Sequence, residues 1–265
     1  MRALIICIFF VFSASLSVAE TVRIAVTTSF HNSGLADVLL PEIKADLGLD
    51  IQLLVVGTGQ ALRMGQSGDV DAVLVHAKSA EEAFVANGYG THRREIMYND
   101  FVLVGPAHDP AGVTGAVNVA EALKSIHGAK TQFVSRGDES GTHKKERALW
   151  QDGSMDPATF GRWYAEVGAG MGAALNTASG LGAYILTDRA SWLNFGNKAD
   201  LKILFSGDPA LFNQYAFLPV NPERQPHVKS DAIRRLETWL VGEKSAGLIN
   251  AYTIMDEQLF TFNGS

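Results

Sequence analysis

Apolar and polar positions follow two different periods along the chain, which is the pattern of a sheet flanked by helices. Short runs of consecutive apolar residues predict buried strands at 22–26, 51–56, 72–75 and 131–134. Apolar residues spaced three or four apart predict helices at 33–47, 60–64, 81–86, 144–150 and 230–240. Strand and helix alternate, so the fold class that we predict is α/β with parallel-type sheets.

Two further apolar strands resemble each other, because each begins at Asn and ends at Pro. They are Asn99–Pro106 and Asn213–Pro222, with about a hundred residues of strand-helix pattern between them. We interpret them as two crossover strands between two lobes. Lobe 1 is then formed by 20–106 and 213–265, and lobe 2 is an insertion, 107–212. The alternative is one continuous sheet with two long edge strands.

The first nineteen residues, 1–19, have the pattern of a cleaved secretory signal peptide. Arg2 gives a basic start, Ala3–Leu16 is almost wholly apolar, and Ser17-Val18-Ala19 supplies small residues before the expected cleavage near Ala19. A membrane anchor is the alternative, but the apolar run is short for a bilayer. We therefore expect export and a periplasmic location.

Composition excludes several classes of function for the mature chain. The chain has one cysteine, Cys7, and cleavage would remove it, so neither a disulfide nor a thiolate metal site is expected. The formal charge of −6 becomes more negative by one when Arg2 is lost, which leaves no electrostatic case for nucleic acid. The remaining length, about 245 residues, is enough for two lobes held together by packing.

Hydroxyl-rich or glycine-rich turns follow several of the predicted strands. Thr27-Thr28-Ser29 and Gly57-Thr58-Gly59-Gln60 follow two strands of lobe 1, and Asn176–Gly180 is interpreted as a similar turn in lobe 2. Any one of them is an ordinary cap or turn when taken singly. Ligands of α/β sheets bind beyond the carboxyl ends of strands, so the recurrence in both lobes favours a shared binding site.

The stretch 135–143 carries the clearest chemistry. It contains the cation Arg136, three hydroxyls and two glycines, and a helix is expected to begin within it. The first N–H groups of a helix lack internal partners and lie at the positive end of its dipole. An arginine fork and hydroxyl donors beside them favour a small anion. The alternative for Arg136 is a surface salt bridge, for example to Asp138.

Other chemistries fit the sequence poorly. A dinucleotide loop at Gly57-Thr58-Gly59 would need a third glycine where Leu62 stands. The seven histidines show no metal-binding spacing, so no metal and no cofactor are predicted. We expect His76 and His143 to pack or hydrogen-bond near the site. A secreted hydrolase would have to use His143 beside Ser140, and no third group is evident to orient that histidine.

These stretches resemble one family, the periplasmic tungstate-binding proteins of ABC-type uptake systems. The resemblance covers most of the mature chain. It is carried by Thr27-Thr28-Ser29, Val56-Gly57-Thr58-Gly59-Gln60-Ala61-Leu62, Gly68-Asp69-Val70-Asp71, Val75-His76-Ala77, Met97-Tyr98-Asn99-Asp100-Phe101-Val102-Leu103-Val104-Gly105-Pro106, Ser135-Arg136-Gly137-Asp138, Ser140-Gly141-Thr142-His143 and Leu186-Thr187-Asp188-Arg189. Each piece is short, but their order and spacing are specific.

The resemblance implies a two-lobed class II periplasmic-binding-protein fold that closes on tungstate, with tungsten bound only as the oxyanion. It also implies a shell of hydroxyls, backbone N–H groups and one arginine. The matching positions are Thr28, Ser29, Thr58, Arg136, Ser140, Gly141 and Thr142, and Thr177 is added from its own turn.

We therefore predict a monomeric receptor, not an enzyme, that delivers tungstate to an ABC permease. Phosphate and molybdate receptors of the same fold are the alternatives. In a phosphate receptor Asp138 would accept the proton of hydrogen phosphate.

Overall fold

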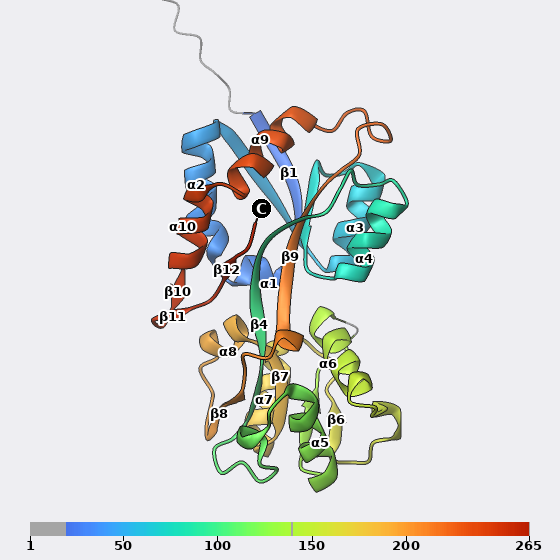
Figure 1. Ribbon diagram of the computed structural model, residues 1–265, viewed down its shortest axis with the longest axis vertical. Coiled ribbons are helices and arrows are strands. Elements are labelled where there is room, and N and C mark those ends of the chain that lie inside the picture. Colours follow the sequence, from blue (N-terminus) through green and yellow to red (C-terminus); the bar gives the residue numbers. More distant parts are fainter. Residues whose placement is uncertain (1–19, 139, 265) are drawn as a thin grey trace, which may run out of the picture.

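The computed structural model describes residues 20–138 and 140–264, so the predicted signal peptide lies outside the described residues. Figure 1 shows two bodies stacked along the long axis and joined by strands near the centre. We call the body around β1–β3 lobe 1 and the body around β5–β7 lobe 2. This arrangement confirms the two-lobed α/β fold, while the residue boundaries of the lobes stay a prediction.

Lobe 1 contains three parallel strands in the order β2-β1-β3, extended by β9 and β4, which run antiparallel to their neighbours. The bounds are β1 (Glu20–Thr27), β2 (Leu49–Val56), β3 (Ala72–Val75), β4 (Arg94–Pro106) and β9 (Phe212–Pro219).

Helices cover both faces of this sheet (Figure 1). They are α2 (Leu35–Leu47), α9 (Ser230–Leu240) and α10 (Glu243–Ala251) on one face, and α3 (Thr58–Ser67) and α4 (Lys78–Ala86) on the other. The alternation of side chains along a strand explains the two apolar clusters. Val22, Ile24 and Val26 of β1 pack with α2 and α9, whereas Ala25 packs with α3 and α4.

Lobe 2 is a smaller sheet in which β5 lies between β6 and β7, all parallel. Its strands are β5 (Phe133–Ser135), β6 (Tyr164–Glu166), β7 (Tyr184–Asp188) and β8 (Leu201–Phe205). Its helices are α5 (Val119–Ala129), α6 (Gly141–Asp152), α7 (Met171–Leu181) and α8 (Arg189–Asn194). An aromatic cluster that includes Trp150, Phe133 and Tyr184 packs against one face of this sheet. Val134 and Ile185 belong to the same apolar cluster as β1 of lobe 1.

One strand belongs to both sheets. The first part of β4 pairs with β9 and with β12 (Thr261–Phe262), and its second part, from Phe101 onward, pairs with β7 and β8. Figure 1 shows β4 and β9 side by side between the two bodies. Both strands lie in the middle of the strand order, so the prediction of two crossover strands is confirmed and the alternative of two edge strands is wrong. A short hairpin, β10 (Thr253–Ile254) and β11 (Glu257–Gln258), precedes β12.

Two predicted elements differ from the structure. The helix expected at 33–47 is α2, which begins two residues later at Leu35, and a short helix that was not predicted, α1 (Thr28–Asn32), precedes it. Gly34 separates the two helices because it adopts a left-handed conformation with φ of 80°. The turn expected at Asn176–Gly180 is wrong, because these residues lie inside α7. Ala174, Leu175 and Ala178 are buried along one face of that helix, and its end comes only at Gly182.

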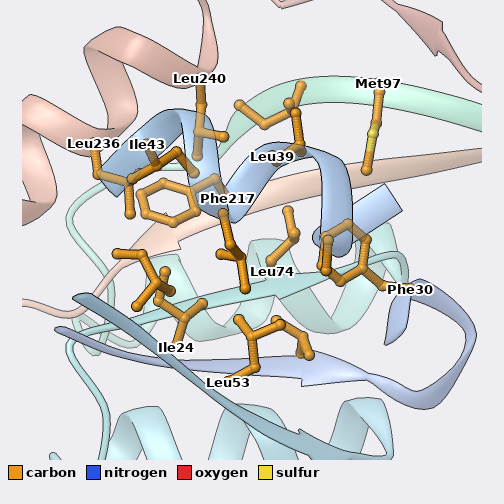
Figure 2. Close-up of a pocket in the computed structure, with 15 residues that line it drawn as sticks. Ile24, Phe30, Leu39, Ile43, Leu53, Leu74, Met97, Phe217, Leu236 and Leu240 are labelled. Carbon is orange, nitrogen blue, oxygen red and sulfur yellow. The ribbon is translucent and has the colours of Figure 1, made fainter. Parts of the chain in front are cut away.

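Lobe 1 contains a small apolar cavity between the sheet and the helices α2 and α9. Its volume is about 40 Å³, and every side chain that lines it is apolar. Figure 2 shows Leu39, Ile43 and Leu240 facing Ile24 and Leu53 across it. A cavity without polar groups stays dry, so this space belongs to the core and offers nothing to an oxyanion. Within 20–138 and 140–264, none of the helices is long and apolar enough to cross a bilayer.

Candidate functional site

The register of the lobe 1 strands brings the expected turns to one edge of the sheet. Thr27 pairs with Val56 on β2, and Val26 pairs with Leu74 on β3. The next residues along each strand therefore stand at the same level. They include Thr28 on the first strand, Gly57-Thr58 on the second and His76 on the third, and this edge of lobe 1 faces lobe 2 in Figure 1.

Two helices begin at this edge. Thr27 caps α1, because its Oγ1 accepts a hydrogen bond from the N–H of Phe30 at 3.3 Å. Thr28 is consequently exposed at the first helical position, and Ser29 is half-buried. Helix α3 begins at Thr58 after Gly57, which supplies no side-chain cap. The first N–H groups of α3 have no partners within the helix, so they are available to an acceptor.

Arg136 directly follows β5 and is held by its surroundings in lobe 2. Its carbonyl oxygen accepts from the N–H groups of Gly168 at 2.8 Å and Ala169 at 3.3 Å, which ties the arginine loop to the start of α7. Its Nη2 donates to Asp138. Its Nε is buried and has no hydrogen-bond partner among the residues that the structure describes. The Nε–H group of Arg136 therefore remains available as a hydrogen-bond donor beside the start of a helix.

Asp138 uses both carboxylate oxygens inside the loop. Oδ2 accepts from Arg136, and Oδ1 accepts from the N–H of Ser140 at 3.2 Å. Burial alone would raise the pKa of the Asp138 carboxyl, but the hydrogen bonds from Ser140 and Arg136 and the arginine charge together lower it. The salt bridge that we considered as the alternative role of Arg136 is thus present, and it orients the guanidinium within the loop.

Helix α6 begins beside the arginine loop. Ser140 is its N-cap, and Ser140 Oγ accepts from the N–H of His143 at 3.2 Å. Gly141 is the first helical residue, and Thr142 is buried with 8% of its surface exposed. Three of the predicted site residues therefore gather at one helix N-terminus.

His76 connects predicted site residues of both lobes. Its Nε2 lies 2.9 Å from Ser29 Oγ in lobe 1. On its other side, a Cβ atom placed on Gly141 of lobe 2 would lie 3.3 Å from His76 Cε1. Ser29 and Gly141 come from opposite lobes, so contact with the same imidazole ring brings them to a common place.

Thr177 does not lie where the sequence placed it. It is in the second half of α7, and its Oγ1 donates to the carbonyl oxygen of Ala173, four residues earlier, at 3.0 Å. The prediction of a helix start at this position is wrong. The true start of α7 is at Gly170-Met171, and the glycines at 168, 170 and 172 were the sequence signal that could have found it.

The start of α7 contributes to a cavity between the lobes. This cavity has a volume of about 240 Å³, and its lining includes Ser29 of α1, Gly172 of α7 and the carboxylate of Asp188. That carboxylate is already bonded, because it accepts from the N–H of Ser191 at 2.9 Å and from its hydroxyl at 2.7 Å. The cavity therefore extends from the start of α7 to Ser29, the residue that contacts His76.

Sequence reasoning missed a buried polar cluster behind Ser29. The ring of Tyr215 of β9 lies tilted against His76, with the two ring centroids 4.7 Å apart, and the Tyr215 hydroxyl oxygen lies 3.4 Å from Ser29 Oγ. Burial lowers the pKa of His76 to about 4, although the Asp188 charge and the Asn213 side chain act in the opposite direction. The imidazole is therefore neutral at neutral pH. Burial also raises the pKa of Tyr215.

The edges of the two lobes together offer hydroxyls, backbone N–H groups and one guanidinium, which are hydrogen-bond donors. In the described part of the chain, no group of three or more His, Cys, Asp or Glu side chains is arranged to hold a metal ion. This donor set suits a ligand that only accepts hydrogen bonds.

Known proteins resemble this chain over most of its length. The family model described as "PBP superfamily domain" matches residues 13–244. A tungstate-binding protein, TupA, of Peptoclostridium acidaminophilum is 44% identical over 234 residues, which are 88% of this chain and 81% of that protein. The chain belongs to the tungstate-binding protein family of the PBP superfamily.

Two solved structures and a further relative are also similar to this chain. The structure of the tungstate-binding protein from Desulfovibrio alaskensis G20 has a TM-score of 0.89 and 43% identity, and the match covers 93% of this chain and all of that one. The structure of the tungstate ABC transporter protein from Geobacter sulfurreducens has a TM-score of 0.78 and 46% identity, covering 88% and 99%. A putative ABC transporter anion-binding protein of Haloferax volcanii is 39% identical, covering 91% of this chain and 71% of that protein.

Proposed function

We propose that this protein is an extracytoplasmic receptor that captures the tungstate oxyanion between its lobes and delivers it to an ABC permease in the membrane. It acts as a monomer in the periplasm after cleavage of the signal peptide near Ala19, and it carries out no covalent chemistry. The observation that carries the proposal is the meeting of Ser29 and Gly141 on the ring of His76, between the lobes. The relatives named as tungstate-binding proteins support the choice of ligand.

The chemistry of the ligand matches the donors. Tungstate is fully deprotonated at neutral pH, so it can only accept hydrogen bonds. In the proposed site, the hydroxyls of Thr28, Ser29 and Thr58 bind it from lobe 1. From lobe 2 it is bound by Arg136 and by the start of α6, where Ser140, Gly141 and Thr142 lie. Closure of the lobes would exclude water and strengthen each of these bonds.

The affinity that a scavenging receptor needs is within reach of such a site. Nanomolar binding corresponds to about −12 kcal/mol. Hydrogen bonds to a charged partner contribute roughly 1.5–3 kcal/mol each. A handful of them, in a site whose donors are already oriented by helix starts, would reach that value.

The phosphate alternative is disfavoured by the arginine loop. A phosphate receptor needs a carboxylate that accepts the proton of hydrogen phosphate, and Asp138 was the candidate. Both of its oxygens already accept hydrogen bonds, one from Arg136 and one from Ser140. Molybdate has the same charge as tungstate and nearly the same size, so it is the competitor that the experiment has to separate.

The hydrolase alternative finds little support in the geometry around His143. Ser140 Oγ accepts from the backbone N–H of His143, and the imidazole faces Glu166 at 3.7 Å. Ser140 therefore acts as the N-cap of α6. A loop arranged in this way supports binding in preference to nucleophilic attack.

Competitive titration calorimetry tests the proposal. The mature protein is titrated with tungstate alone and then in the presence of molybdate, sulfate or hydrogen phosphate. We expect tungstate to bind most tightly, with molybdate next and with sulfate and phosphate far weaker. Absence of tungstate binding, or equally tight binding of phosphate, would overturn the proposal. Turnover of ester or phosphoester substrates would overturn its non-catalytic part.

A further inference from the structure

His76 lies at a point where segments from both lobes meet. It follows β3, contacts Ser29 of α1 and Tyr215 of β9, and faces the first residue of α6. The family resemblance assigns no ligand contact to this histidine. Its position next to two predicted ligand residues therefore calls for a separate role.

The surroundings of Ser29 Oγ restrict where its single proton can point. Oγ lies 2.9 Å from His76 Nε2, 3.1 Å from Thr27 Oγ1 and 3.4 Å from Tyr215 Oη. A serine hydroxyl donates one hydrogen bond and accepts two. Ser29 can donate to an oxyanion only if none of these neighbours accepts its proton.

The neutral imidazole of His76 can exist as either of two tautomers, and they have opposite consequences. With hydrogen on Nε2, the ring donates to Ser29 Oγ and leaves the serine proton for the ligand. With hydrogen on Nδ1, Nε2 becomes an acceptor and takes the serine proton, so Oγ would present only lone pairs. Lone pairs directed at a dianion are repulsive.

We propose that His76 is a positioning residue that sets the direction of the Ser29 hydroxyl, by holding the Nε2–H tautomer when the oxyanion is bound. His76 does not touch the ligand in this proposal, and it acts through Ser29. The inference rests on the proposed function, because it needs an oxyanion between the lobes.

Three variants of the mature protein test the role of the ring through tungstate affinity. His76→Leu removes the donor and should weaken binding about tenfold to a hundredfold, the range expected for a hydrogen bond to a charged ligand. His76→Gln places an amide N–H donor near the position of Nε2 and should recover most of the loss. Arg136→Ala is the reference variant, because it tests the site itself without touching His76.

A spectroscopic measurement on the unmodified protein tests the tautomer directly. Nitrogen-15 NMR of the imidazole side chains distinguishes Nε2–H from Nδ1–H, and His76→Gln assigns the signal by its disappearance. We expect the Nε2–H tautomer in the tungstate complex. This measurement also decides the question if His76→Leu does not fold, as judged by circular dichroism.

The outcomes separate this inference from the proposed function. If the unmodified protein binds no tungstate, the proposed function fails and this inference fails with it. If tungstate binds, Arg136→Ala loses affinity and His76→Leu binds normally, only the role of His76 is wrong. The Nδ1–H tautomer in the complex would likewise overturn it.

Discussion

The two sides of the cleft use different chemistry. Lobe 1 offers neutral groups, namely hydroxyls, the start of α3 and the neutral ring of His76. Lobe 2 offers the charged groups, because Arg136 and Asp138 lie in one loop beside the start of α6. The comparison teaches that one lobe can supply the attraction for an anion while the other supplies directed hydrogen bonds.

Arg136→Ala should produce the largest change and would test whether the charge resides in lobe 2. Removing one partner of a buried, hydrogen-bonded charge typically costs about 2–5 kcal/mol. We therefore expect tungstate affinity to fall about thirtyfold to several thousandfold in titration calorimetry. Arg136→Lys should lie between, because it keeps the charge but loses the planar fork.

Arg162→Ala is the matched control for charge. Arg162 is exposed and precedes β6, at the other end of that strand from the arginine loop. Its removal changes the net charge equally and should leave affinity nearly unchanged. Similar losses in the two alanine variants would mean that lobe 2 attracts the anion only through its overall field.

Glu146→Gln extends the comparison of the two lobes to the pH dependence of protein stability. Burial raises the pKa of the Glu146 carboxyl to about 7, against hydrogen bonds from Tyr164 at 2.7 Å and Trp150 at 3.2 Å. The folded state therefore holds this proton more tightly than the unfolded state. The resulting stability is complete below about pH 4.5 and is lost as pH rises through about 7, by about 3 kcal/mol in all. Glu146→Gln should remove this loss in chemical unfolding at pH 8.

His76 has the opposite pH dependence and provides the internal contrast. Its pKa in the folded protein is lowered to about 4, so the unfolded state binds its proton more readily. Stability from this group is present above about pH 6.5 and is lost as pH falls toward 4. In the unmodified protein, the two groups change stability with pH in opposite directions. His76→Gln should therefore leave the pH dependence that comes from Glu146, and Glu146→Gln should leave the pH dependence that comes from His76. Identical pH profiles in all three proteins would contradict the pKa assignments.

Gly141→Ala should have the smallest effect and probes the contact between the sides. The added Cβ would lie 3.3 Å from His76 Cε1, closer than ordinary van der Waals contact, so the ring or the helix start has to move by a few tenths of an ångström. We expect tungstate affinity to fall by about threefold to tenfold. Gly180→Ala in α7 is the matched control, because a Cβ there meets no atom within 4 Å and Gly180 does not line the cavity between the lobes. Equal effects would show that closure is insensitive to this contact.

Much of the fold could be predicted from the sequence, because apolar residues recur at regular intervals along the long strands and helices. Strand β3 and helix α9 begin and end where the apolar pattern predicts, and the crossover strands were recognised from their Asn and Pro ends. The short strands β6 and β8 were not predicted, since they span only three and five residues. Strands of this kind are specified by their neighbours in the sheet.

The candidate site was accessible only where its residues lie next to each other in the chain. The turn from Ser135 to His143 could be read directly, because one helix start holds its cation, hydroxyls and glycines. The cluster of His76, Asp188 and Tyr215 comes from three separate elements, so only the fold brings it together. Thr177 was misplaced because a helix rich in Ala and Gly resembles a turn when it is read by composition.

The strand shared by both sheets has a consequence for how the molecule comes apart. Strand β4 changes its partners between Asp100 and Phe101, and Arg189 of α8 clamps the Asp100 carboxylate with bonds of 2.7 Å and 2.6 Å at that point. Losing either half would strip this strand of its pairing partners and release buried backbone groups in the other half. One buried apolar cluster also contains residues of both bodies, for example Ile24 of β1 and Ile185 of β7. We therefore expect the two lobes to unfold together as one cooperative unit.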